Sequence, residues 1–208
     1  SKISDWHKLI VDFRDQFPYD EFTALIVETF ANSLDAGATI VRIEVKEDIF
    51  RISDNGKGMT QNEFEQYHNI ASLSKTRGES IGFAGVGAKI FLDCATHIIT
   101  ETKSRNFHGS TFWEFPGKVP TYKIIGNPNR FRYEYDLGTY IEIKVREDMD
   151  RKNLTPSFVK DVLKTYYNTA LLGHYNLKEV YINNEILYGE EIFRSDIENN
   201  ERSEIQIQ

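Results

Sequence analysis

The alternation of apolar and polar residues in "TIVRIEVKEDIFRISD" (39–54) constrains the fold more than any other feature. A period of two puts apolar side chains on one face of a strand. Because the alternation continues across a short turn, the stretch predicts a β-hairpin with one buried face. Later segments also have strand character, the last as a small terminal hairpin: "HIITETK" (97–103), "STFWEF" (110–115), "TYKIIG" (121–126), "GTYIEIKV" (138–145) and "EVYINNEIL" (179–187).

Helical spacing of apolar residues predicts several helices around these strands. The first is amphipathic and stops before Pro18, with its apolar side chains at Trp6, Leu9, Ile10, Phe13 and Phe17. The others are expected at about 19–35 with Gly37 as its cap, at 61–70, from "AKIFLDCA" (88–95), and at 155–173 closed by Gly173. Hairpins dominate over regular βαβ alternation. This predicts an α+β two-layer sandwich, a largely antiparallel mixed sheet with helices on one face.

The chain divides into one main unit with two short flanking segments. We expect an amphipathic N-terminal helix over 1–18, a single domain over 19–194 and a polar tail over 195–208. Residues 71–89 are polar, basic and glycine-rich, with little periodicity. They predict a long mobile loop, and loops of this length are usually functional.

Charge and cysteine content narrow the function classes. The 208 residues carry a formal net charge of −7, with 25 Lys+Arg against 32 Asp+Glu. The domain as a whole is therefore a poor DNA-wrapping surface, although a local basic groove or an attached partner would change that. The single cysteine, Cys94, cannot form an internal disulfide, which favours a reducing compartment. With no apolar run of about 20 residues and no signal peptide, we predict a cytoplasmic protein without a membrane partner.

Three polar residues interrupt the apolar helix predicted over 19–35. At helical spacing Glu28, Asn32 and Asp35 share one face. One interpretation is a solvated face of an amphipathic helix. The other is chemical: Glu28 acts as a general base on water, Asn32 offers an amide oxygen to Mg²⁺, and Asp35 fixes their surroundings.

Two glycine loops carry the other candidate residues. "ISDNGKGM" (52–59) is turn chemistry, and it also suits Asp54 accepting a hydrogen bond from an exocyclic amine such as adenine N6. "GFAGVGAKI" (82–90) places three glycines before a helix, whose N-terminal amides attract phosphate. It is not a Walker A loop, because Ala88 and Ile90 replace the required residues. Neither loop is specific alone.

Taken in order, these pieces resemble one family. E-x-x-x-N-x-x-D-A, then D-x-G-x-G-M, then G-x-x-G-x-G, and a late Gly138-Thr139 box are similar to the GHKL ATPases. That superfamily includes DNA gyrase ATPase subunits, ninety-kilodalton heat-shock chaperones, histidine kinases and MutL-type mismatch-repair proteins. The resemblance implies the Bergerat ATP-binding fold with a mobile ATP lid, and ATP and Mg²⁺ as cofactors.

The resemblance also implies roles for individual residues. Glu28 matches the catalytic base, Asn32 the Mg²⁺ ligand and Asp54 the aspartate that reads adenine. Thr139 matches the hydroxyl near the adenine. The remaining implied nucleotide-binding residues are Asp35, Gly56, Gly58, Met59, Lys75, Gly82, Gly85, Val86, Gly87 and Ala88. For Lys75, a phosphate contact and a solvated loop position remain equal alternatives.

Within the superfamily, "NSLDAGA" and the lid look closest to MutL- or MORC-like members. Such members act as ATP-gated dimeric machines on DNA or protein, and they need a basic residue from a following transducer domain. We therefore expect slow hydrolysis by this chain alone, ATP-dependent homodimerisation, and a transducer domain or partner protein. The alternatives are a nucleotide-binding scaffold module without turnover and a histidine-kinase-like phosphotransfer domain.

Overall fold

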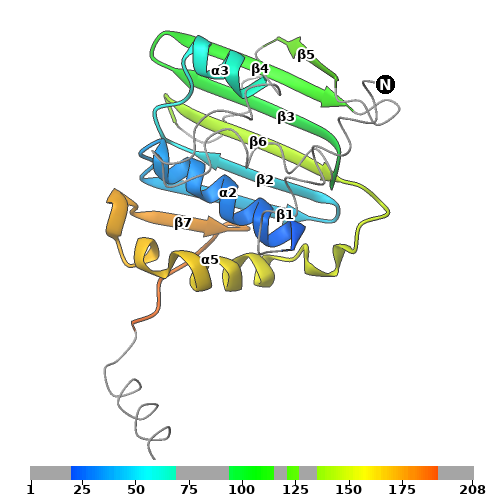
Figure 1. The fold of residues 1–208 in the computed structure, drawn as a ribbon. Helices are drawn as coiled ribbons and strands as arrows, with labels where there is room; N and C mark the ends of the chain where they lie inside the picture. Colours follow the sequence, from blue (N-terminus) through cyan, green and yellow to red (C-terminus); the bar gives the residue numbers. More distant parts are fainter. Residues whose placement is uncertain (1–19, 69–93, 115–120, 127–134, 192–208) are drawn as a thin grey trace, which may run out of the picture.

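The computed structural model describes residues 20–68, 94–114, 121–126 and 135–191 (Figure 1). Eight strands of this part form one sheet in the order β5-β4-β3-β6-β2-β1-β7-β8. Their bounds are β1 Ile40–Lys46, β2 Ile49–Asp54, β3 Ala95–Ser104, β4 Phe107–Glu114, β5 Thr121–Ile125, β6 Gly138–Val145, β7 Glu179–Ile182 and β8 Glu185–Ile186. Only β1 and β7 pair in parallel; the other neighbours are antiparallel. The predicted hairpin and the α+β class are confirmed.

In the part of the chain that the structure describes, three α-helices lie on one face of this sheet (Figure 1). They are α2 (Glu21–Asp35), α3 (Gln61–His68) and α5 (Pro156–Leu171). α2 and α5 pack against each other, and α5 also contacts β7. α3 lies over the other end of the sheet, where the Tyr67 hydroxyl is 3.0 Å from Thr100 Oγ1 and His68 Nε2 is 2.7 Å from Thr111 Oγ1.

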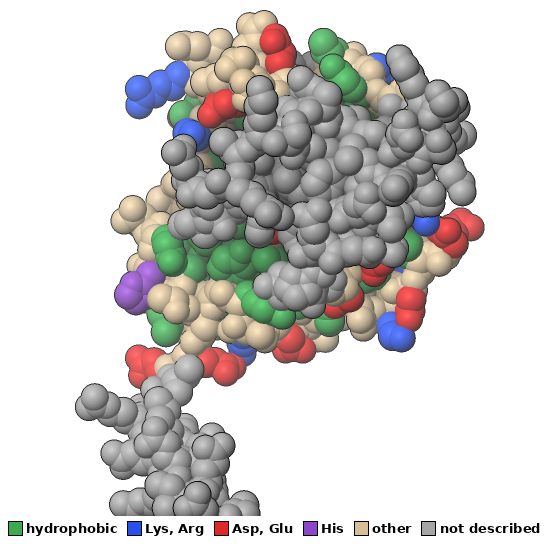
Figure 2. All heavy atoms as spheres, in the orientation of Figure 1, with side chains coloured by type: hydrophobic (Ala, Val, Ile, Leu, Met, Phe, Trp, Pro, Cys, Tyr) green, Lys and Arg blue, Asp and Glu red, His purple; other side chains and the backbone are tan. Residues whose placement is uncertain are grey.

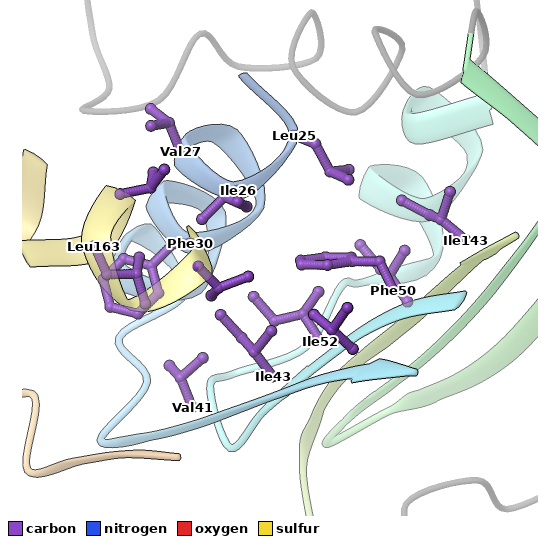
Figure 3. Close-up of a cluster of buried hydrophobic side chains, with 14 of the residues drawn as sticks. Leu25, Ile26, Val27, Phe30, Val41, Ile43, Phe50, Ile52, Ile143 and Leu163 are labelled. Carbon is purple, nitrogen blue, oxygen red and sulfur yellow. The ribbon is translucent and has the colours of Figure 1, made fainter. Parts of the chain in front are cut away.

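The core fills the space between the helices and the sheet, as Figure 3 shows. Phe50 and Ile52 of β2 point toward Leu25 of α2, and Phe30 lies close to Leu163 of α5. All five side chains are buried. Removing this apolar surface from water is the main force that holds the helical layer on the sheet.

Caps fix both ends of α2. The Asp20 carboxylate accepts hydrogen bonds from the amides of Phe22 and Thr23, at 3.1 and 3.0 Å, so the helix begins at Glu21. At the other end Gly37 has φ +72° and its amide donates to the Leu34 carbonyl. This left-handed position ends the helix, as the sequence predicted.

The remaining helical predictions have mixed outcomes. The helix expected over 155–173 is confirmed as α5, with Thr155 as its N-cap, but the break at Tyr167 inside it was not predicted. The helix expected at 61–70 is described as far as His68. The predicted helix of 1–18, the loop of 71–89, the helix opening at 88 and the tail of 195–208 lie outside the described residues. Among the described helices, none is long and apolar enough to cross a membrane.

Leu25→Ala is expected to lower the free energy of unfolding by about 2–5 kcal/mol, because Leu25 is fully buried and its truncation leaves a cavity. The matched control is Leu172→Ala, at a residue 46% exposed, which should cost below about 1 kcal/mol. Urea unfolding of both variants measures the two values. Equal costs would show that α2 is not packed into the core as described.

Candidate nucleotide-binding site

Asp54 is the last residue of β2 and faces the helical layer. Its side chain is buried, with 5% of the residue exposed. Oδ1 accepts a hydrogen bond from the Gly56 amide at 2.8 Å, and Oδ2 accepts one from Ser33 Oγ at 3.1 Å. The backbone of Thr139, its register partner on β6, also donates to it. The carboxylate therefore joins the end of β2, the inner side of α2 and the start of β6.

Burial controls the ionisation of this carboxylate. Desolvation raises the pKa of Asp54 from 3.8 to about 6, and the hydrogen bonds from Gly56, Ser33 and Thr139 oppose that rise. The group is therefore mainly ionised at neutral pH and acts as a hydrogen-bond acceptor. A carboxylate has about four acceptor positions, so these three donors leave capacity for a ligand amine.

The loop after Asp54 is fixed to neighbouring backbone by Asn55. Asn55 Oδ1 accepts hydrogen bonds from the amides of Thr39 and Ile40, both at 2.8 Å. The Lys57 amide donates to the Ala36 carbonyl at 3.0 Å. The loop that begins with Asp-Asn-Gly is therefore not merely a solvent-exposed turn. Its hydrogen bonds connect the end of β2 to the end of α2 and to the start of β1.

Gly58 and Met59 continue this loop along β3. Gly58 has φ +65°, and a Cβ placed on it would lie 2.1 Å from the Lys103 carbonyl oxygen. Only glycine fits such an approach. The Met59 amide donates to Thr102 Oγ1 at 2.8 Å, which fixes the residue beside the sheet.

Thr139 lies in the same neighbourhood, at the start of β6. Its Oγ1 is 3.3 Å from Thr102 Oγ1. A Cβ on the preceding Gly138 would lie 1.9 Å from the Asp54 carbonyl oxygen, so the two strands approach closely here. The structure thus brings Thr139 close to Asp54, Gly56, Gly58 and Met59, a short stretch that lies far from it in the sequence.

The polar residues of α2 have three different environments. Glu28 is buried, at 4% exposed, Asn32 is half-buried and Asp35 is exposed. A uniformly solvated helix face is therefore wrong for Glu28. Asp35 sits in the last turn, one residue before the C-cap.

Two residues that sequence reasoning missed belong to this cluster. Ser33 lies on the buried side of α2 and donates to Asp54, while Thr102 links Met59 to Thr139. The sequence contains a weak indication for Ser33, because the hydroxyl of a serine inside a helix often forms a hydrogen bond with another group. Thr102 carried none, because its role depends on the β3–β6 register.

The predicted phosphate end of the site lies outside the described residues. It comprises Lys75, Gly82, Gly85, Val86, Gly87 and Ala88. Among the described residues, no group of three or more His, Cys, Asp or Glu side chains forms a metal site. The Asn32 amide oxygen and the Glu28 carboxylate are hard donors, which suit Mg²⁺ when phosphate oxygens and waters complete its shell.

Comparisons with known proteins agree with this arrangement. The family described as "Histidine kinase-, DNA gyrase B-, and HSP90-like ATPase" matches residues 19–119. Two relatives from strains of Porphyromonas gingivalis, both described as DNA mismatch repair protein MutL, are 44% identical over 55 residues. That alignment covers 25% of this chain and 9% of each relative.

Residues 19–119 are thus similar to this ATPase family. The resemblance drawn from the motifs is confirmed, and the partial similarity to MutL supports the MutL-like side of the MutL- or MORC-like prediction. Asp54, Gly56, Gly58 and Met59 lie within the matched residues, whereas Thr139 lies beyond them. The roles of these individual residues remain predictions.

Replacing Asp54 with Asn should change how stability depends on pH. Between pH 3.8 and about 6 the unfolded carboxyl is ionised while the folded one is protonated. The wild type therefore loses stability as pH rises through this window, by about 3 kcal/mol at about 1.4 kcal/mol per pKa unit. Above the folded pKa the curve should flatten.

The measurement is the free energy of unfolding of wild type and Asp54→Asn from pH 3.5 to 7. Taking the difference between the two proteins cancels the titration of the other carboxylates. Parallel curves would contradict the raised pKa.

Gly58→Ala is expected to destabilise the protein more than Gly37→Ala. Both glycines have positive φ, so each alanine pays about 1 kcal/mol of backbone strain. The new Cβ at position 37 meets nothing within 4 Å, whereas at 58 it collides with the Lys103 carbonyl. Overpacking should add about 1–3 kcal/mol at position 58. Denaturant unfolding compares the two, and equal costs would show that the loop does not lie against β3.

Proposed function

We propose that this chain binds ATP and hydrolyses it slowly with Mg²⁺. The observation that carries the proposal is the buried Asp54 carboxylate, held by Gly56, Ser33 and Thr139 with acceptor capacity remaining. Such a fixed acceptor suits the exocyclic amine of adenine. Gly58 and Met59 line the base, and the Thr139 hydroxyl lies close to it.

The residues of α2 supply the chemistry. Glu28 takes a proton from the attacking water as general base, and its burial strengthens electrostatic interactions there. Asn32 would hold Mg²⁺ through its amide oxygen, and Asp35 would order the neighbouring side chains or a water. When bound, Mg²⁺ neutralises charge at the phosphate oxygens. On the strength of the sequence motif alone, we assign the phosphate contacts to Gly82, Gly85, Val86, Gly87, Ala88 and Lys75.

We further propose that the module serves a larger ATP-gated dimeric machine. The support is the MutL similarity, although the aligned part covers only 9% of those relatives. Residues 1–18 would contribute to dimerisation, and a transducer domain or partner would supply a basic residue for the γ-phosphate. The relatives' description as DNA mismatch repair proteins suggests DNA as one substrate on which such a machine acts. With a net charge of −7, this domain is not the main DNA contact.

Two alternative functions remain distinct from this proposal. One is a nucleotide-binding scaffold without turnover, and the other is phosphotransfer to a histidine. A base at Glu28 has no purpose in a pure binder. Transfer would label the protein or a partner with phosphate, whereas hydrolysis releases phosphate to water.

Glu28→Gln should keep ATP binding and lose hydrolysis. The substitution preserves size in a buried site and replaces one carboxylate oxygen with an amide NH2 group, which removes both the charge and the basicity. We expect turnover by the wild type below about 1 per minute, slow beside typical enzymes, and at least about a hundredfold less in the variant. Calorimetry with Mg²⁺ and a non-hydrolysable ATP analogue measures binding, and phosphate release measures turnover.

Asp54→Ala is the binding control and should abolish saturable binding. Asp54→Asn, which keeps the side-chain volume, covers the case in which the alanine variant fails to fold. Binding unaffected by both variants would contradict the adenine assignment. Binding without turnover in the wild type would favour the scaffold function.

A further inference from the structure

Helix α5 is interrupted at a position where its sequence gives no reason for a break. Tyr167 has φ −128° and ψ 21°, outside the helical region. Within α5 the sole proline is Pro156 in the first turn, and the helix contains no glycine. Kinks in helices have identifiable causes, and here the cause must be tertiary contacts.

One such contact reaches the proposed catalytic helix. The Tyr167 hydroxyl donates to the Val27 carbonyl of α2 at 2.9 Å. The Tyr167 ring also packs on Phe30, with centroids 4.9 Å apart. The carbonyl of Val27 belongs to the same planar peptide unit as the amide nitrogen of Glu28. The hydroxyl therefore fixes the peptide unit from which the Glu28 side chain begins.

The next residue holds the other side of the break. Asn168 Nδ2 donates to the Glu190 carbonyl, and the Glu190 amide donates back to Asn168 Oδ1, both at 2.7 Å. We call this two-way pair the Asn168–Glu190 clasp. Lys164 pairs with the Glu190 carboxylate, and Lys160 Nζ lies 2.6 Å from the Glu185 carboxylate. Residues 185–190 are thus held along α5.

The clasp is on the surface, unlike the contact at Val27. Asn168 is half-buried and Glu190 is exposed. Figure 2 has the same orientation as Figure 1, in which α5 runs along the lower edge of the domain. Along this edge Figure 2 shows acidic and basic side chains next to one another. Exposed pairs of this kind contribute little to stability. Their main effect is on the geometry of the turn that contains Tyr167.

We propose that Tyr167 is a positioning residue for Glu28, and that the Asn168–Glu190 clasp sets the turn that presents its hydroxyl. This inference rests on the proposed hydrolysis by Glu28. The chain of contacts runs from the backbone of residue 190, through the break in α5, to the peptide unit of Val27 and Glu28. A change in residues 185–190 therefore alters catalysis without touching the adenine pocket around Asp54.

The test uses the 208-residue chain with Tyr167→Phe, which removes only the hydroxyl. Turnover at saturating Mg²⁺-ATP should fall about tenfold, because a small misplacement of a base is costly. The dissociation constant for a non-hydrolysable ATP analogue should stay within about twofold, since the adenine pocket is unchanged. Asn168→Ala should change turnover in the same direction by less. The control is Tyr175→Phe, at a residue 54% exposed.

Hydrogen exchange of the α2 amides gives a second measurement that does not need activity. Tyr167→Phe should speed exchange in the turn after Val27, whereas Tyr175→Phe should not. Wild-type turnover and exchange in Tyr167→Phe would overturn the inference, as would equal losses of binding and turnover. If the wild type binds ATP without turnover, the hydrolysis proposal fails. Unchanged exchange in Tyr167→Phe would then overturn the contact's role separately.

Discussion

The burial of one carboxylate is the constraint on which the rest of the site depends. Asp54 is 5% exposed, and an unsatisfied buried charge is expensive. Its hydrogen bonds come from the loop after β2, from α2 through Ser33, and from β6 through Thr139. These three elements must keep their relative positions to satisfy it. The same bonds that stabilise the fold therefore also orient the acceptor that we propose for adenine.

Close backbone approach builds the walls of this site. The loop containing Gly58 lies against the Lys103 carbonyl of β3, and Gly138 lies against the Asp54 carbonyl. Hydrogen bonds from Met59 to Thr102, and between Thr102 and Thr139, continue the contact along the sheet. Rigid backbone of this kind suits recognition of a flat base. The cost of ordering it is met during folding rather than at binding.

Helix α2 both packs into the hydrophobic core and contributes side chains to the candidate site. Leu25 and Phe30 anchor the helix in the core, and Ser33 contacts Asp54. Glu28, on the same helix, is also buried. A shift of the helix therefore moves Glu28, the proposed general base, relative to the proposed adenine pocket around Asp54. The contact from Tyr167 of α5 acts on this same helix, and it links α2 to the helix packed beside it.

The sequence alone determined the local elements and the resemblance to this ATPase family. Alternation over 39–54 predicted the β1–β2 hairpin, Gly37 predicted the end of α2, and the ordered motifs with Glu28 and Asp54 predicted an ATPase of this family. These features depend on residues close in the chain, where spacing and turn chemistry decide the outcome.

Tertiary structure decided the burial and the long-range contacts that the spacing of residues in the sequence does not predict. Glu28 is buried and Asp35 is exposed, and this difference depends on what packs over each turn of α2. Ser33 and Thr102 join the site only through the packing of α2 and the β3–β6 register, and Tyr167 leaves helical geometry only because distant groups hold it. Those contacts join residues many positions apart, so the folded layers had to bring them together before their chemistry could appear.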